Sequence, residues 1–144
     1  MPSVKDYNRL PLGKGEPRKR RKAREKRQER KVVGDVRPQC VDRDNYCRWY
    51  WLDESIRREI AALIGPCSGP SEWAHIRKRW STRNMEPTER HSTAESLMLC
   101  RRHHQSDIAG FDRRVYDIEP MTENGANGRL RIVLPDGRTW EEPQ

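Results

Sequence analysis

The sequence predicts a small α+β domain that needs a bound metal for stability and that follows a disordered basic arm. Only 33% of the 144 residues are hydrophobic and 36% are charged, so the apolar core must be small. Four cysteines are present, and no apolar stretch is long enough for an export signal or a membrane span. We therefore expect a cytoplasmic protein whose reduced thiols hold metal and form no disulfides.

The basic excess is confined to the first 37 residues. This arm has 14 Lys or Arg against 5 Asp or Glu, a net charge of +9, whereas residues 38–144 carry −1. Residues 18–31 contain one Ala and no larger apolar residue, so they cannot pack on a core and should be mobile on their own. Such a run favours sequence-independent binding to nucleic-acid phosphates, although a solvated tail or a localisation tag has the same composition. The expected contacts are Arg18, Lys19, Arg20, Arg21, Lys22 and Arg24.

The compact part is expected to begin near Val36, because Gly34 and Pro38 punctuate the end of the arm. We divide the rest of the chain into a metal-stabilised domain at 38–112 and C-terminal strands at 113–144 that pack on it. An inserted helix follows Asp53, a suitable N-cap, and stops at Gly65. Its apolar residues recur at helical spacing: Ile56, Ile60, Leu63 and Ile64.

Short strands and irregular loops are expected after this helix. Residues 71–76 read as a strand and 77–91 as a polar loop. Residues 96–100 form either a second strand or part of a helix capped by Ser92 and Glu95, and 100–107 are helical in both cases. Residues 113–120 and 129–135 form a β-hairpin, and a Pro-Asp-Gly turn precedes 138–140.

Cysteine and histidine spacing predicts a structural zinc site. Residues three or four apart share a helical face, so Cys100 can pair with His103 or His104, while the adjacent histidines point about 100° apart and cannot easily serve one ion. A tetrahedral zinc site is then supplied by Cys47, Cys67, Cys100 and His103. Cys40 is an alternative to either of the first two cysteines, and metal-free burial of all of them is the simpler interpretation.

Three consecutive aromatic residues follow Cys47. Trp49, Tyr50 and Trp51 can stack on bases, but in a chain with few large apolar residues we expect them to pack around the zinc site.

His75 is the candidate general base. It lies in a short apolar segment, where a single histidine is usually a hydrogen-bonded core residue. Because the zinc site does not use His104, His75 can also be interpreted as a catalytic residue that acts together with His104. A neutral imidazole beside a phosphate can take a proton from water, and a divalent cation on His104 can offset the charge on the phosphate.

Three segments in this order resemble the HNH (His-Asn-His, ββα-metal) nuclease family, especially small phage-type members. They are RDNYCRWYW, WAHI and SLMLCRRHH, and the resemblance covers about residues 38–110. It implies a ββα-metal domain in which His75 is the general base and His104 is a catalytic metal ligand. Cys100 and His103 take the second half of the structural zinc site, with His103 where a cysteine is more usual.

The chain departs from the family at two positions. Ala74 stands where many members have a metal-binding Asp or His, and Glu95 stands where the middle Asn is expected. Asp107, three residues beyond His104, is the expected replacement ligand, followed by His91 and Glu72. The middle Asn has four candidate substitutes: Asn84, His91, Ser92 and Thr93. Basic side chains around the site are expected to hold phosphates: Arg77, Lys78 and Arg79 after the base, and Arg101 at the helix.

The sequence therefore predicts a metal-dependent endonuclease that hydrolyses or nicks DNA with Mg²⁺ or another divalent cation. Double-stranded DNA is the expected partner and RNA the alternative. The resemblance also implies a phage-encoded protein in a bacterial cytoplasm, with packaging or recombination proteins as further partners. The competing hypothesis is an inactive zinc-stabilised nucleic-acid-binding module or an adaptor of a phage DNA-processing machine.

Overall fold

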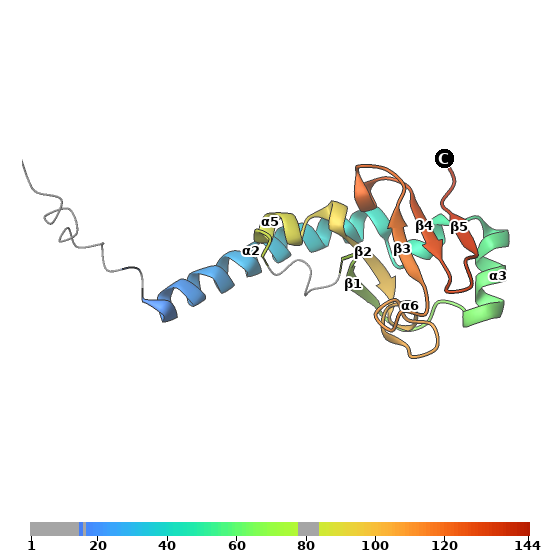
Figure 1. Ribbon diagram of the computed structural model, residues 1–144, viewed down its shortest axis with the longest axis horizontal. Coiled ribbons are helices and arrows are strands. Elements are labelled where there is room, and N and C mark those ends of the chain that lie inside the picture. Colours follow the sequence, from blue (N-terminus) through green and yellow to red (C-terminus); the bar gives the residue numbers. More distant parts are fainter. Residues whose placement is uncertain (1–14, 16, 78–83) are drawn as a thin grey trace, which may run out of the picture.

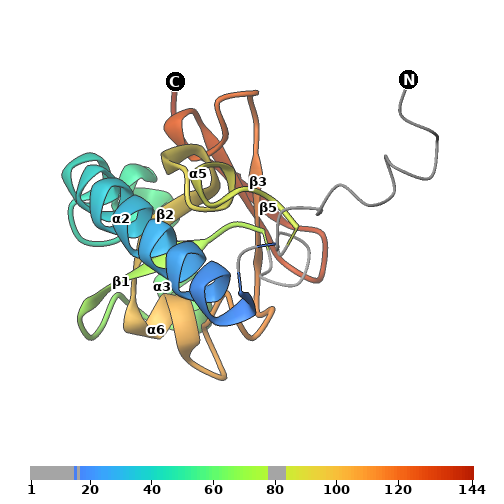
Figure 2. The ribbon, with the colours of Figure 1, turned by 90° about the vertical axis from the view of Figure 1, so that its left-hand side faces the viewer.

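A computed structural model describes residues 15, 17–77 and 84–144 of the chain. It is an α+β structure in which a long helix, α2 (Arg18–Asp44), projects from a folded body with two small antiparallel sheets (Figure 1). Viewed along the projecting helix, the short helix α5 lies beside α2 (Figure 2). The α+β class is as predicted.

The basic segment differs most from the prediction. Residues 18–37, expected to be disordered on their own, belong to α2, and Gly34 and Pro38 lie inside this helix and do not end the arm. Along the helix only Cys40 and Asp44 are fully buried, and Val32, Val33 and Val36 are partly buried. Its attachment to the body is made largely by polar side chains, which a hydrophobic pattern does not reveal.

Two side chains at the end of α2 bind the outer edge of strand β2 (Ser96–Cys100). The backbone N–H of Met98 donates to Asp44 Oδ2 at 2.9 Å, and Arg43 donates to the carbonyls of Ser96 and Thr93 at 2.8 and 2.7 Å. The bonds to Met98 and Ser96 satisfy strand groups that face away from β1, so the helix end covers this edge of the sheet.

A 3-10 helix, η1 (Arg48–Trp51), and helix α3 (Glu54–Ile64) follow α2. Helix α3 confirms the predicted inserted helix, with Ile60 buried; Asp53 stands at the N-cap position, but its side chain makes no capping hydrogen bond. It ends at Gly65, whose φ of 93° lies in the left-handed region that glycine adopts without a steric penalty.

Strand β1 (Ser71–His75) pairs antiparallel with β2, with Ser71 opposite Cys100 and His75 opposite Ser96. Residues 96–100 therefore form the predicted strand, and the alternative helix from Ser92 is wrong. Between the strands lie α5 (Pro87–Arg90), in a loop predicted to be irregular, and the 3-10 helix η2 (Thr93–Glu95). Helix α6 (Arg101–Gln105) follows β2 directly and is shorter than the predicted 100–107.

The C-terminal segment forms a three-stranded antiparallel sheet, one strand more than the predicted hairpin. Its order is β3 (Asp117–Pro120), β4 (Leu130–Val133) and β5 (Thr139–Glu141), with the 3-10 helix η3 (Gly125–Asn127) before β4. The third strand contains Trp140, which is buried. The prediction missed it because the segment is only three residues long.

A single apolar cluster joins the two sheets. It includes Leu97 and Leu99 from β2 and Ile118, Ile132 and Trp140 from the C-terminal sheet. No helix in the described part of the chain combines the length and the apolar character that a bilayer span requires.

A buried ionic network also links α2 to the C-terminus. Arg48 contacts Glu142 at 2.7 Å and Asp44 at 3.1 Å, and all three side chains are almost fully buried. Its guanidinium also donates to the carbonyls of Ala126 and Gly128. Because each charge is paired, the network fixes the end of α2 against the C-terminal sheet without leaving an isolated buried charge.

Candidate metal centre and histidine site

Four side chains from separate parts of the chain form a possible metal site. Cys47 precedes η1, Cys67 follows α3, Cys100 ends β2, and His103 lies on α6. Their ligand atoms all lie within 4.8 Å of one another, and this is the one group of three or more such residues found within the described ranges. The structure thus brings together the four predicted zinc ligands.

The distances in this cluster fit a tetrahedral zinc ion. His103 Nδ1 lies 3.2 Å from Cys100 Sγ, 3.5 Å from Cys67 Sγ and 3.9 Å from Cys47 Sγ. Zinc bonds of about 2.3 Å to sulfur and about 2.0 Å to nitrogen put the N and S corners of a tetrahedron about 3.5 Å apart. Three thiols and one imidazole are also the donor set of structural zinc sites, so the Cys3His cluster fits this metal.

The imidazole of His103 is fixed by its surroundings. Its Nε2–H donates to the carbonyl of Gly65 at 3.1 Å, which leaves the Nδ1 lone pair directed at the thiols. The ring also stacks on Trp49, with centroids 3.9 Å apart and an angle of 6° between the planes. Near Gly65, the Arg102 guanidinium occupies the place where a Cβ atom would lie. Glycine is favoured here by its backbone angle, and a side chain at this position would also displace the Arg102 guanidinium.

The three thiols influence one another strongly when no cation is bound. Hydrogen bonds donated by Cys47 and Cys67 lower the pKa of Cys100 well below its usual range. The hydrogen bond with Cys100 raises the pKa of the Cys67 thiol to about 12, and that of Cys47 is raised further by the same neighbours. One thiolate beside two protonated thiols is the expected metal-free state.

The remaining cysteine and the aromatic run have different surroundings. Cys40 lies outside the cluster, with its Sγ 3.4 Å from Ser96 Oγ, so it does not replace a ligand in this arrangement. Of the three aromatic residues, Trp49 is buried against the site as expected, whereas Tyr50 and Trp51 are exposed. Arg48 lies over the Trp51 ring at 3.7 Å.

The second cluster joins His75 to two residues far away in the sequence. His75 Nε2 lies 2.9 Å from His91 Nδ1, and His91 Nε2 lies 2.9 Å from Glu29 Oε1 on α2. His91 follows α5 and is buried. Since each ring nitrogen of His91 has a hydrogen-bond partner, its role here resembles that of an orienting residue more than that of a metal ligand.

His104 lies between two carboxylates. Its Nδ1 is 3.4 Å from Glu72 Oε1 and its Nε2 is 3.2 Å from Asp112 Oδ2. The predicted pairing with Asp107 is not formed, because α6 ends at Gln105 and Asp107 turns toward Arg113 with its side chain 86% exposed. Glu72, the third choice from the sequence, is the acidic residue that β1 brings to His104.

Basic side chains near the histidines are paired with acids. Arg77 forms two hydrogen bonds with Glu95 at 2.7 and 2.8 Å, which raise the pKa of its guanidinium. Arg101 contacts Glu72 at 3.2 Å and is mostly exposed. The predicted phosphate contacts at Lys78 and Arg79 lie outside the described residues.

The predicted contacts on the arm lie on the exposed N-terminal half of α2. Helix geometry spaces them by about 1.5 Å per residue. The residues concerned are Arg18, Lys19, Arg20, Arg21, Lys22 and Arg24.

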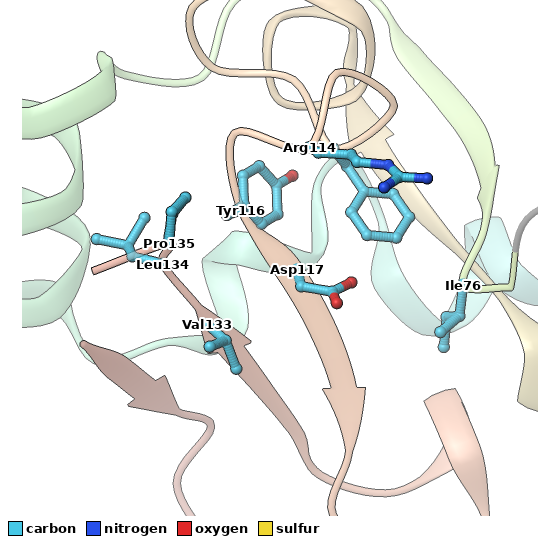
Figure 3. Close-up of a pocket in the computed structure, with 8 residues that line it drawn as sticks. Ile76, Arg114, Tyr116, Asp117, Val133, Leu134 and Pro135 are labelled. Carbon is cyan, nitrogen blue, oxygen red and sulfur yellow. The ribbon is translucent and has the colours of Figure 1, made fainter. Parts of the chain in front are cut away.

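A pocket of about 560 Å³ lies between the C-terminal sheet and the segment after His75 (Figure 3). Ile76 lines one side, and the side chains of Arg114 and Asp117 point into the space between β3 and that segment. The other lining residues are mostly apolar. None of the sequence-predicted site residues lines this pocket.

The fold and the site define a small α+β protein with a buried Cys3His group that could bind a metal. Comparison of the chain with protein-family models, with curated proteins and with solved structures gives no match.

Two residues of these clusters were not among the sequence candidates. Glu29 belongs to the basic arm, where the sequence indicates only phosphate binding. Asp112 comes from the loop after α6, and its N–H donates to the carbonyl of His104. One of two acids within a basic run is a weak signal, and only the fold brings Glu29 to His91.

Proposed function

We propose that this protein is a zinc-stabilised, HNH-type nuclease that hydrolyses phosphodiester bonds in DNA with the help of a divalent cation. The observation that carries the proposal is the hydrogen-bonded line from His75 through His91 to Glu29. An imidazole held by a second polar group, which is in turn held by a carboxylate, is the arrangement of an oriented general base. Its place at the end of β1, with β2 and α6 following, supports the HNH-type assignment.

His75 would take a proton from the attacking water. The hydroxide formed in this way attacks phosphorus in line with the 3′ oxygen, which leaves with the electrons of the broken P–O bond and is then protonated by solvent. The products would be a 5′ phosphate and a 3′ hydroxyl. The positive charge that develops on the His75 ring is stabilised by its hydrogen-bond partner.

His104 and Glu72 would hold the divalent cation. Their contacting atoms are 3.4 Å apart, near the separation of about 3 Å for neighbouring ligands of an octahedral Mg²⁺ ion. Glu72 is two residues before Ala74 and so shares its face of the strand, which explains how it could act in place of a ligand at that position. When bound, the cation would supply positive charge to the phosphate and the leaving oxygen.

The exposed basic residues of α2 would bind the DNA backbone without reading its sequence. Counterion release makes such binding strongly dependent on salt. The folded body presents no comparable basic excess, because residues 38–144 carry a net charge of −1.

A plasmid-nicking assay with Mg²⁺ or Mn²⁺ tests this function. His75→Ala should lower the nicking rate by about 10²-fold or more, since general-base catalysis contributes about that much. Glu72→Gln should also lower it, whereas Asp107→Asn, a matched loss of one carboxylate near the same helix, should leave it unchanged. Equal nicking by the wild-type and His75→Ala proteins would refute the nuclease.

The exposed basic helix also favours a second candidate, a nucleic-acid-binding module without hydrolytic activity. It predicts salt-sensitive retention on DNA or RNA, no nicking with any divalent cation, and no effect of His104→Ala on binding. The same protein preparations therefore decide between the two functions.

A further inference from the structure

Glu29 lies within the basic run of α2 but contacts the histidine site. Besides the bond to His91, Glu29 Oε1 lies 3.7 Å from Arg90 Nη1 on α5. Figures 1 and 2 show that helix α5 lies beside α2, so residues in and after α5 can contact Glu29. Two segments separated by 62 positions thus meet through a carboxylate and an imidazole.

The proton arrangement along this line follows from the acceptor at its end. A carboxylate only accepts hydrogen bonds, so neutral His91 must carry its proton on Nε2 and present a lone pair at Nδ1. The proton between the two rings then belongs to His75 Nε2. Neutral His75 therefore has its remaining lone pair on Nδ1, the nitrogen that would accept a proton from water.

We propose that Glu29 is a positioning residue that sets the tautomer and orientation of His75 through His91. The proposal deepens the nuclease assignment and rests on it for its catalytic consequence. Under it, α2 supplies both the cations that bind nucleic acid and the carboxylate that prepares the general base. Losing the helix would then lower kcat as well as weaken binding.

Glu25 provides a matched control for the test. It lies one turn earlier on the same helix, pairs with Arg21 at 3.7 Å and has a side chain 61% exposed, against 37% for Glu29. Glu25→Gln and Glu29→Gln remove the same charge from the same basic helix. The two substitutions should therefore change the electrostatic attraction to DNA alike. A difference in kcat between the variants then reports on the hydrogen bonds that join Glu29, His91 and His75.

The experiment measures nicking kinetics and imidazole tautomers in the full-length chain. Glu29→Gln should lower kcat by about tenfold to hundredfold, the usual loss when an outer partner of a functional histidine is removed, without raising KM. Glu25→Gln should leave kcat unchanged. ¹⁵N NMR spectra should show His91 protonated on Nε2 in the wild-type and Glu25→Gln proteins, with this preference lost in Glu29→Gln.

Two results would overturn the proposal: equal kcat values for the two glutamine variants, or a His91 tautomer that does not respond to Glu29→Gln. The NMR measurement needs no catalysis. If the wild-type protein nicks no DNA, the nuclease assignment fails, and the spectra alone decide whether Glu29 positions His75.

Discussion

Removing the metal from the Cys3His site is expected to unfold most of residues 40–110. The ligands Cys47 and Cys67 are 20 positions apart, and Cys67 and Cys100 are 33 apart. In a chain-entropy treatment, cross-links that close loops of these lengths stabilise a protein by about 3 and about 4 kcal/mol. Together they amount to about 7 kcal/mol, roughly half or more of the free energy of unfolding of an ordinary domain.

Circular dichroism during heating measures this loss. A chelator should lower Tm by about 15 to 25 °C or remove the cooperative transition, given about 2–4 °C per kcal/mol in a chain of this size. Cys67→Ser should lose bound zinc, measured by metal analysis. Cys40→Ser is the control, because Cys40 is buried but contacts Ser96 and not the ligands. An unchanged transition with chelator, or equal zinc loss in the two serine variants, would show that the site is wrongly assigned.

Three further predictions concern the same body of the protein. At pH 7, zinc binding should release about two protons, one from each thiol with a raised pKa, so affinity should fall about 100-fold per pH unit on acidification; calorimetry in two buffers counts the protons. Arg48→Ala should destabilise the fold by about 3–5 kcal/mol in urea unfolding, because it leaves the buried carboxylate of Glu142 without its cationic partner, whereas Asp44 keeps its pair with Arg43; stability within about 1 kcal/mol of wild type would contradict this. Gly65→Ala should strain the backbone beside His103 and weaken zinc binding in a competition titration, an expectation that unchanged affinity would refute.

The zinc ligands could be predicted from residue type and, for two of them, from their spacing in the sequence. Few residue types bind zinc, and the gap between Cys100 and His103 places both on one side of a short turn. Helix α3 was predicted because its apolar residues follow the 3.6-residue period, whereas the short apolar run of β2 fitted a strand and a helix equally.

The rest depended on contacts between distant polar groups. Glu29 and His91 meet only because α2 continues past Gly34 and Pro38, and its last turn is held by the side chains of Arg43 and Asp44. The failed pairing of His104 with Asp107 has a local cause, since helix α6 stops two residues too early. Periodicity gives the face of a helix, but it does not give the residue at which the helix ends.

The polar cover on β2 has a consequence for how the protein behaves when α2 is lost. One edge of strand β2 pairs with β1, and its other edge is covered by the side chains of Asp44 and Arg43. Without the helix, the apolar stretch from Leu97 to Leu99 would display open backbone donors and acceptors, a template on which strands of other molecules can assemble. Helix α2 would thus also protect the protein from aggregation.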